Sequence, residues 1–450
     1  MIPFESSPRE ANNPLVFRLS ERRVFFDRVA KERERWSEKA TFYRASLINY
    51  FRMLIPSGCR VLEIGCGRGD LLAAMKPSFG VGVDISPEAV SQAKEKYSGL
   101  HFLAGYAEHL PVQGSFEYII LSDVLGHLED IQKTLEALQP LMTPSTRIVI
   151  TYYNFLWEPI LNLTERLGLK QPVGKQNWLS TPDVENLLTL ANVEVVRKIN
   201  RMLLPARIPF LSVLFNRFLA QFPFLAKLCL SHFIVARPRR ASSSPRTDYS
   251  CSIIIPTRNE RGNIKDLVDR LPDFGLKTEL IFVDGNSTDG TVEAIEEVIR
   301  ENKGRKDIKL IHQGSGVGKG DAVRKGFAAA KCDILMILDS DISVAPEDVE
   351  KFYRVLADGK AEFANGSRLV YPLEDDAMRT LNIFGNKAFS LMFTWLLGQT
   401  FRDTLCGTKA IFREDYERIA ASREYFGDFD PFGDFDLIFG AVRLNLKIVQ

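Results

Sequence analysis

The sequence of 450 residues predicts an α/β protein with two domains, each built on an open and mostly parallel sheet. Two stretches repeat the order of apolar strand, glycine-containing loop and helix, one beginning near Cys59 and one near Cys251. Between them, the run from Arg237 to Arg246 holds four arginines, three serines and two prolines, with no larger apolar residue. Such a run cannot bury enough surface to offset its ordering entropy. We therefore expect a tether between two domains, the alternative being a long surface loop within one domain.

The first elements are expected to be helices. Residues from about Pro14 to Leu54 show a charged, amphipathic pattern, with Phe25, Val29, Trp36 and Tyr43 at inward positions. We expect these helices to cover one side of the first sheet.

The first strand leads into a glycine turn. The apolar run from Cys59 to Ile64 is typical of a buried parallel strand, and a helix from Asp70 to Met75 follows. Between them, Gly65, Gly67 and Gly69 let the backbone approach a ligand closely. The dinucleotide fingerprint has the spacing Gly-x-Gly-x-x-Gly instead, so this turn need not face a phosphate.

A second apolar strand ends on Asp84, about twenty residues beyond the glycines, where a carboxylate can bind both hydroxyls of a ribose. Ser86 then caps a helix that has Pro87 in its first turn. Three further strands are expected at 101–103, 118–121 and 147–151. The loops after these strands lie where open α/β sheets bind ligands.

Over roughly Ile55 to Arg237, these residues resemble the class I S-adenosylmethionine-dependent methyltransferases, which implies a Rossmann-like sheet and S-adenosylmethionine as cofactor. In that family the first motif holds the methionine part, and the acid at the position of Asp84 holds the ribose. The family often has an adenine-contacting aspartate where this chain has Tyr106; Tyr106 could stack instead, or the backbone and Glu108 could serve. The cofactor-binding residues implied are Glu63, Gly65, Gly67, Gly69, Asp84, Tyr106, Ala107, Glu108 and Asp123.

Methyl transfer from a sulfonium is an in-line displacement, for which an enzyme supplies mainly proximity and orientation. His127 belongs to the family's motif after the fourth strand and could deprotonate an acceptor. Alternatively, it is a helix-start residue that helps to close the cofactor pocket. Further on, Ser180 or Thr181 is expected to cap a helix, and Trp178 either lines the acceptor pocket or packs in the core.

The second half repeats the alternation of strands and polar loops, with strands expected at 251–255, 279–283 and 308–311. The loop after the second of these strands begins with Asp284 and opens a long helix. The loop at 314–320 is rich in glycine and could accommodate a nucleotide, with Lys319 bringing a positive charge. It is not a P-loop, because Gly320 stands where that motif needs serine or threonine.

The strongest local signal is a buried strand from Ile334 to Leu338 that ends in Asp339-Ser340-Asp341. In extended backbone, residues two apart point the same way, so the two carboxylates would repel each other unless a cation joined them. Oxygen ligands suit Mg²⁺ or Mn²⁺, which usually bring substrate phosphates with them. The alternative is a solvated acidic turn.

From roughly Tyr249 onward, the chain resembles glycosyltransferase family 2, with its GT-A fold, and within it the dolichyl-phosphate glucose or mannose synthases. The likeness rests on Asp339-x-Asp341, on Gly366-Ser367-Arg368 and on Asp403-x-x-Cys406-Gly407-x-Lys409. The nucleotide-sugar-binding residues implied are Pro256, Thr257, Asn259, Glu260, Asp284, Lys319, Asp339, Ser340, Asp341 and Arg368, with the metal on Asp339 and Asp341. The acceptor-side residues implied are Asp403, Cys406, Gly407 and Lys409.

Asp434 and Asp436 lie where this family keeps a catalytic carboxylate, and the pattern aligns in two ways. A lipid-phosphate acceptor is already ionised, so the carboxylate would orient it rather than deprotonate it. Alternatively, both aspartates only cap a helix. Relatives of the lipid-phosphate type usually continue with an arginine- and tyrosine-rich segment and membrane helices, so we expect the second domain to be truncated at Gln450.

The composition limits which partners and which cellular compartment are expected for this chain. Lysine and arginine (58) nearly balance aspartate and glutamate (57), which argues against a global nucleic-acid partner. The six cysteines include no Cys-x-x-Cys pair, and the N-terminus lacks the pattern of a signal peptide. Reduced thiols in the cytoplasm are therefore expected.

No apolar stretch reaches the roughly 20 residues of a spanning helix. The stretches from Ile208 to Val235 and from Leu381 to Leu397 come part way, and each could lie on a membrane surface or pack as core or lid. Peripheral contact with the cytoplasmic face of a membrane is thus one expectation for this chain.

Together these features predict a helical cap (1–54), a methyltransferase domain (55–237), a linker (238–248) and a GT-A domain (249–450). The expected function is a fused bifunctional transferase. The first domain would methylate a small or lipid-linked acceptor, and the second would transfer a sugar from a UDP- or GDP-linked donor. The sugar acceptor would be a polyprenyl- or dolichyl-type phosphate or a cell-envelope glycan precursor. The alternative is that only one domain is active and the other is a nucleotide-binding scaffold.

Overall fold

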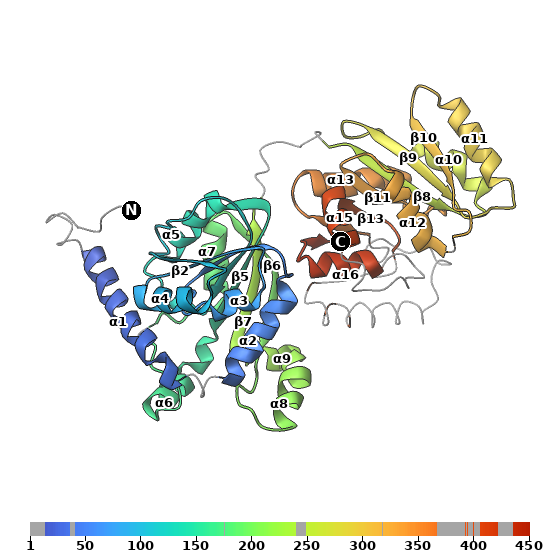
Figure 1. The fold of residues 1–450 in the computed structure, drawn as a ribbon. Helices are drawn as coiled ribbons and strands as arrows, with labels where there is room; N and C mark the ends of the chain where they lie inside the picture. The colour runs from blue at the N-terminus through green and yellow to red at the C-terminus, as the bar shows by residue number, and fades with distance from the viewer. Residues whose placement is uncertain are drawn as a thin grey trace. The chain divides into compact units, whose positions relative to one another are not determined.

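The computed structural model describes residues 14–36, 41–174, 176–239, 249–316, 318–366, 406–421 and 435–450, together with residues 392, 394 and 399. The chain divides into two compact units, Met1–Arg239 (unit 1) and Arg240–Gln450 (unit 2), shown in Figure 1. Each unit is an α/β structure around one seven-stranded sheet, so the predicted fold class is confirmed.

The unit 1 sheet has the strand order β3-β2-β1-β4-β5-β7-β6. Strands β1 to β5 are parallel, β7 is antiparallel to β5, and β6 is antiparallel to β7. The strands are β1 (Arg60–Ile64), β2 (Phe79–Asp84), β3 (His101–Ala104), β4 (Phe116–Ser122), β5 (Met142–Tyr153), β6 (Val193–Arg201) and β7 (Ser231–Pro238). The helices are α1 (Pro14–Trp36), α2 (Thr41–Leu54), α3 (Asp70–Ala74), α4 (Pro87–Lys96), α5 (Ile131–Leu138), α6 (Glu158–Arg166), α7 (Thr181–Leu190), α8 (Leu211–Val213) and α9 (Pro223–Ala226).

Both faces of this sheet are covered. Val61 and Leu62 are neighbours in β1, yet they pack into two different buried clusters, as the alternation of side chains along a strand requires. The predicted helix starts are confirmed. The Ser86 hydroxyl accepts a hydrogen bond from the Ala89 N–H, and Ser180, rather than Thr181, caps α7 in a capping box with Asp183.

The unit 2 sheet has the order β10-β9-β8-β11-β13-β12-β14, in which β13 runs antiparallel to β11 and β12. The strands are β8 (Cys251–Thr257), β9 (Thr278–Asp284), β10 (Asp307–His312), β11 (Ile334–Ile337), β12 (Phe363–Asn365), β13 (Lys409–Phe412) and β14 (Ile448–Val449). The helices are α10 (Ile264–Arg270), α11 (Thr291–Glu301), α12 (Gly318–Ala329), α13 (Val349–Ala357), α15 (Arg413–Ala421) and α16 (Phe435–Arg443). Again, Ile253 and Ile254 pack into opposite clusters, so this sheet is also covered on both faces.

The tether predicted from Arg237 onward begins too early. Arg237 and Pro238 end strand β7, and the Arg237 side chain is 0% exposed. Its guanidinium forms an ion pair of 2.6 Å with Glu194 of β6, which satisfies the charge inside the sheet. Composition alone could not predict that Arg237 is buried, because it does not distinguish an arginine with a buried ion-pair partner from a solvated one.

Within the described residues, every helix is too short or too polar to cross a bilayer. Of the two apolar stretches, 208–235 forms α8, further helical turns and α9, and then enters strand β7. Most of the other stretch, 381–397, lies outside the described residues.

Candidate active sites

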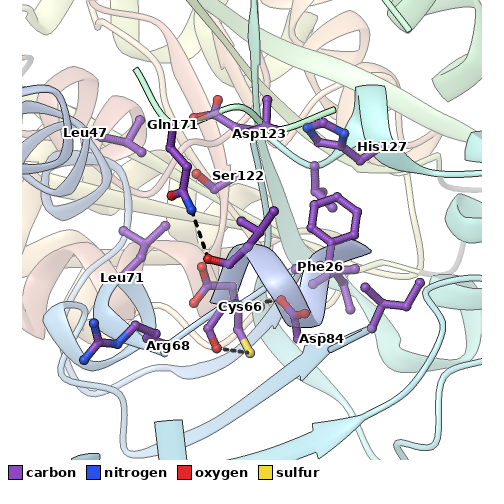
Figure 2. Close-up of a pocket in the computed structure, with 18 of the residues that line it drawn as sticks. Phe26, Leu47, Cys66, Arg68, Leu71, Asp84, Ser122, Asp123, His127 and Gln171 are labelled. Carbon is purple, nitrogen blue, oxygen red and sulfur yellow. Dashed lines mark hydrogen bonds between the residues drawn. The ribbon is translucent and has the colours of Figure 1, made fainter. Parts of the chain in front are cut away.

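A cavity of about 510 Å³ lies at the carboxyl edge of the unit 1 sheet, where the loops after β1 to β4 meet (Figure 2). Small-molecule sites usually have volumes of roughly 300–1,000 Å³, so this cavity suits a ligand of cofactor size. Helices α1 and α2 form one wall. Of their four predicted inward positions, Val29, Trp36 and Tyr43 line the cavity, whereas Phe25 packs against the Phe26 ring.

The glycine turn needs its glycines. Gly65, Gly67 and Gly69 have φ values of 73°, 51° and 77°, in the left-handed region that favours glycine. A Cβ on Gly65 would lie 2.7 Å from Cγ2 of Val124, so a side chain there would collide with the loop after β4. Gly65 and Gly67 line the cavity, as does the buried Glu63, whereas Gly69 precedes α3 as its N-cap.

Asp84, at the end of β2, lies directly against this turn. Its Oδ2 accepts a hydrogen bond of 2.7 Å from the Gly67 N–H, and its Oδ1 accepts one of 2.9 Å from the Ser86 N–H. A carboxylate has about four acceptor positions, so it can accept several hydrogen bonds at once. The structure therefore brings the predicted ribose acid and the glycine turn together at one end of the cavity (Figure 2).

The next loop carries the predicted adenine contacts. Tyr106, Ala107 and Glu108 all line the cavity. Glu108 has a structural task as well, because its Oε1 accepts hydrogen bonds from the N–H groups of Glu129 and Asp130, at 3.1 and 3.3 Å, just before α5. Tyr106 forms no hydrogen bond through its hydroxyl to the described residues, which leaves its ring and hydroxyl available to a ligand.

Asp123 lies toward the opposite end of the cavity, in the loop after β4 (Figure 2). Its backbone is in the left-handed region, with φ of 52°. The Tyr43 hydroxyl donates to its Oδ2 at 2.6 Å, and the Thr151 hydroxyl donates to its Oδ1 at 2.9 Å. Burial raises the pKa of Asp123, although these hydrogen bonds oppose the shift. Burial and the Asp123 charge together raise the pKa of Tyr43 well above its ordinary value, so Tyr43 stays protonated and donates.

His127 also lines this end of the cavity. Its ring meets the Phe26 ring edge to face, with centroids 5.4 Å apart. Burial, with smaller contributions from the charges of Lys170 and Arg22, lowers the pKa of His127 to about 4. The imidazole is therefore neutral at physiological pH and can accept a proton. The Arg22 guanidinium donates to the His127 carbonyl at 2.6 Å, which ties α1 to this loop.

Helix α1 is also fixed beside the ribose acid. Asp27 accepts hydrogen bonds from the Ser86 hydroxyl at 2.5 Å and from the Glu88 N–H at 3.2 Å, just beyond Asp84. Together with the Arg22 contact, this makes α1 a cover that is held to both ends of the cavity. Trp178, by contrast, is absent from the lining and packs beside the buried cluster of Leu161, Met202 and Leu230.

In unit 2, the predicted donor-binding residues gather at the carboxyl ends of β8 and β9. Asp284 is buried at the end of β9, where its carboxylate accepts hydrogen bonds from the N–H groups of Asn286 and Ser287. Asn259 has φ of 56°, and its Oδ1 accepts a hydrogen bond of 2.9 Å from the Thr288 N–H. The loops after β8 and β9 thus support each other. Pro256 and Thr257 end β8, and Glu260 donates its N–H to Thr291 at 3.0 Å.

The predicted pair of carboxylates follows β11, but the argument that placed it was wrong. Strand β11 ends at Ile337, so Asp339 and Asp341 do not alternate along extended backbone. Residues 340–341 form a turn, and Ile342 has φ of 57°. Asp341 is exposed, and its Oδ1 accepts from the Ser343 N–H.

Asp339 instead pairs with Lys319 of α12, at 2.6 Å between Oδ1 and Nζ. Gly407, from the predicted acceptor-side motif, lies against this pair. A Cβ on Gly407 would come 2.0 Å from Asp339 Oδ2 and 2.2 Å from Lys319 Nζ. The structure therefore brings the glycine-rich loop, the two-aspartate turn and the acceptor-side motif together around Asp339.

Neighbouring groups hold this arrangement in place. The Ser340 hydroxyl donates to the Pro256 carbonyl at 3.0 Å, and the buried Lys409 donates to the Cys406 carbonyl at 2.6 Å. Asp436 lies in the first turn of α16, whose Leu437 and Ile438 are buried against the sheet. Arg368, Asp403 and Asp434 lie outside the described residues.

Sequence reasoning missed two groups of residues. One surrounds Asp123, where Thr151, Tyr153 and Lys170 come from β5 and from the loop after α6. The other is the ion pair between Lys319 and Asp339, since the motifs predict that Lys319 contacts the nucleotide rather than a carboxylate of the chain. Such pairs join segments that are distant in the sequence, so they leave no local pattern. The helical periodicity of 14–54 did predict that Tyr43 faces inward, but not that it contacts Asp123.

Comparisons with known proteins identify both units. The family model for a methyltransferase domain matches residues 55–188, and the model for glycosyl transferase family 2 matches residues 252–426. The chain joins a methyltransferase domain to a family 2 glycosyltransferase domain. Both resemblances predicted from the motifs are thereby confirmed.

The glycosyltransferase domain is similar to dolichol-phosphate mannosyltransferase of Saccharomyces cerevisiae, with 38% identity over 112 residues, 24% of this chain and 41% of the relative. It is also similar to polyprenol monophosphomannose synthase of Mycolicibacterium smegmatis, with 30% identity over 175 residues, 38% of this chain and 64% of the relative. The chain thus spans less than two thirds of each of these relatives. A solved SAM-dependent methyltransferase of Thermotoga maritima aligns with a TM-score of 0.38 and 17% identity, over 48% of this chain and 99% of that one.

Proposed function

We propose that the chain is a bifunctional transferase. The methyltransferase domain takes a methyl group from S-adenosylmethionine, and the glycosyltransferase domain takes a sugar from a UDP- or GDP-linked donor with the help of a divalent cation. The sugar acceptor is a polyprenyl- or dolichyl-type phosphate, as the names of the relatives suggest for those proteins.

The contact between Asp84 and the glycine turn carries the first half of the proposal. The Gly67 N–H orients the carboxylate at 2.7 Å in a cavity of cofactor size, where a carboxylate can accept hydrogen bonds from ribose hydroxyls. The glycine turn leaves room for the methionine part, because Gly65 has no side chain and lines the same cavity. S-adenosylmethionine supplies an electrophilic methyl group on a sulfonium, and the protein supplies its orientation.

The polar residues at the other end of the cavity suit a methyl acceptor. Neutral His127 can accept a hydrogen bond from the methyl acceptor, although its lowered pKa makes it a weak base, and Asp123 is fixed by Tyr43 and Thr151 so that its carboxylate can orient an acceptor hydroxyl or amine. Helix α1 is held to both ends of the cavity through Arg22 and Asp27, so it forms a wall beside the site. The acceptor is a small molecule or the head of a lipid.

The position of Asp339 carries the second half. Its half-buried carboxylate presents oxygen, the ligand that Mg²⁺ and Mn²⁺ prefer, and Gly407 leaves the space beside it free of a side chain. Asp339 and Asp341 would hold the cation, and Lys319 would turn from Asp339 to the donor diphosphate. Such a cation stabilises the charge that builds on the leaving diphosphate. Asp284 and Asn259 would hold the nucleoside, and Asp436 or Asp434 would orient the acceptor.

Calorimetric titration of the full chain tests both halves separately. S-adenosylhomocysteine should bind without metal, and UDP or GDP should bind only when Mn²⁺ is present. Absence of both would refute the proposal, and binding of only one ligand class would restrict the activity to one domain. Radiolabelled sugar donors, offered with polyprenyl phosphate, would then identify the sugar by mass spectrometry of the lipid product.

A further inference from the structure

The exposed apolar side chains of unit 1 gather at the edge of the sheet that holds the cavity. Most of the large apolar side chains exposed in the described part of the chain lie in two segments, 155–169 and 208–228. We call their exposed surface the apolar face; examples are Phe155, Leu163, Leu167, Phe210, Phe218 and Phe224. Contiguous apolar surface of this kind usually marks an interaction site.

Topology places both segments at one edge. Tyr153, Ser231 and Arg201 lie side by side in the register of β5, β7 and β6, and Tyr153 is the carboxyl end of β5. The segment 155–169 follows Tyr153, and the segment 208–228 lies between Arg201 and Ser231. Figure 1 accordingly shows α6, α8 and α9 at the same end of unit 1.

Hydrogen bonds hold the two segments against each other. The Asn154 side-chain amide donates to the carbonyls of Lys227 and Cys229, and the Trp157 indole N–H donates to the Leu228 carbonyl at 2.8 Å. Beneath them, Leu161 and Leu230 pack in one buried cluster and also line the cavity. The apolar face is therefore the outer side of elements whose inner side forms the cavity wall.

The 208–228 part of this face carries charges of one sign, whereas the 155–169 part holds Glu158, Arg166 and Glu165, the last of which pairs with Lys170. Between Glu194 and Asp248 the sequence contains no acidic residue, whereas Arg207, Arg217 and Lys227 are all exposed. No carboxylate of the described residues pairs with these three side chains. A second copy of the chain that docked symmetrically through 208–228 would bring these like charges together, whereas an anionic bilayer would complement them.

We propose that the apolar face docks unit 1 on an anionic membrane, with its aromatic side chains in the acyl boundary and its cations at the headgroups. Phe210 fits this role, since its side chain is 90% exposed and its φ of 62° is unusual for a bulky residue. Docking would bring the cavity wall formed by Leu161 and Leu230 next to the bilayer. This surface goes beyond methyl transfer and does not depend on it.

Vesicle co-sedimentation of the full chain tests the proposal, with phosphatidylcholine vesicles that contain roughly one third phosphatidylglycerol compared with pure phosphatidylcholine. Wild type should prefer the anionic vesicles and lose that preference in high salt. Phe210→Ser with Phe224→Ser should weaken binding on the order of tenfold or more, because each aromatic side chain leaves the boundary. The control pairs Met53→Ser with Leu190→Ser, whose side chains are 71% and 55% exposed at the opposite edge of the sheet, and should bind as wild type does.

Three outcomes would overturn the proposal: vesicle binding that ignores the Phe210 and Phe224 changes, binding that ignores lipid charge, or a dimer in ultracentrifugation that these changes dissociate. Titration with S-adenosylhomocysteine is the independent readout. If it is unchanged in the aromatic variant while vesicle binding falls, methyltransferase folding and docking are separated. If the variant fails to fold, hydrogen exchange of wild type decides: anionic vesicles should protect 208–228, and lack of protection refutes docking.

Discussion

The two units present their acidic residues to ligands in different ways. In unit 1, Asp84 accepts hydrogen bonds from the backbone N–H groups of Gly67 and Ser86 and lines an open cavity. In unit 2, Asp339 is compensated by Lys319, and Gly407 closes on the pair. The first carboxylate faces its cavity through backbone contacts, whereas the second is paired with a lysine; if the proposed metal and diphosphate bind there, one cation would replace another.

This difference follows from the ligands. Ribose hydroxyls are neutral donors, so a carboxylate can accept from them without any exchange of ions. A diphosphate with a divalent cation carries large charges of both signs, and without them a half-buried carboxylate needs a counter-charge. Lys319 supplies that charge within the chain, and the proposed function would turn it to the diphosphate.

The largest effect is expected from Asp339→Asn combined with Asp341→Asn. Metal-dependent binding of UDP or GDP should fall on the order of a hundredfold or more, because both oxygen ligands lose their charge. S-adenosylhomocysteine binding should not change, since the two sites lie in different units. The control Asp348→Asn removes a carboxylate that pairs with Lys351 and should leave nucleotide binding intact. Equal loss of both ligands in the double variant would contradict the independence of the sites.

The next largest effect concerns Asp84→Ala. Affinity for S-adenosylmethionine should fall by about 1–3 kcal/mol, because the ribose hydroxyls and the Gly67 N–H both lose an acceptor. Calorimetry measures this directly, with Glu117→Ala, which removes a carboxylate bonded to the Arg60 N–H, as a control. An unchanged dissociation constant for Asp84→Ala would rule out its ribose role.

The sequence predicted the parallel strands of both units, because each strand can be recognised from its own residues. Apolar runs such as 61–64 and 253–255 are buried on both faces, so each strand is marked by its own composition. Asp84 and Asp284 end such strands, and position alone puts them at the ligand-binding edge. The sequence motifs were therefore enough to predict the strands of each sheet and the position of Asp84 and Asp284.

What the sequence could not predict depends on segments that meet only in the folded chain. The partner of Asp339 is Lys319, twenty residues earlier on helix α12, and the partners of Asp123 include Tyr43 from α2. Strand alternation failed at Asp339 and Asp341 because the chain leaves the sheet after Ile337, where a turn with Ile342 in the left-handed region begins. Conformations of this kind are set by packing rather than by the residue types involved.

The stability of the two units should respond differently to mild acid. Burial lowers the pKa of His127 and of His232 to about 4, from an ordinary value of 6.5. Below 6.5 the unfolded chain binds protons that folded unit 1 does not, so its stability falls between pH 6.5 and about 4, by on the order of 3 kcal/mol for each histidine. In unit 2, burial pushes the pKa of Glu279 upward, but hydrogen bonds from Lys309 and Ser252 outweigh it and hold the pKa at about 2. That contribution is lost only as pH falls from 4.5 toward 2.

Hydrogen exchange of peptides from each unit measures this difference. Mild acid should loosen unit 1 first, and His232→Gln should reduce that response, while His312→Gln in unit 2 serves as the exposed control. If unit 2 instead loosens first between pH 6.5 and 4.5, the buried histidines do not make unit 1 the more acid-sensitive unit.

The smallest expected effect tests the exchange of cations itself. Lys319→Met keeps the length of the side chain but removes the charge that pairs with Asp339, so Mn²⁺ should bind more tightly in the absence of nucleotide. A half-buried pair of this kind contributes about 0–1 kcal/mol, so the gain should be no more than about fivefold. Affinity for UDP or GDP with Mn²⁺ should fall in the same variant, because Lys319 no longer meets the diphosphate. Lys325→Met is the matched control on α12, since Lys325 pairs with Asp321 instead. Opposite signs for metal and nucleotide are the signature of exchange, and a loss of both would mean that Lys319 only holds the turn in shape.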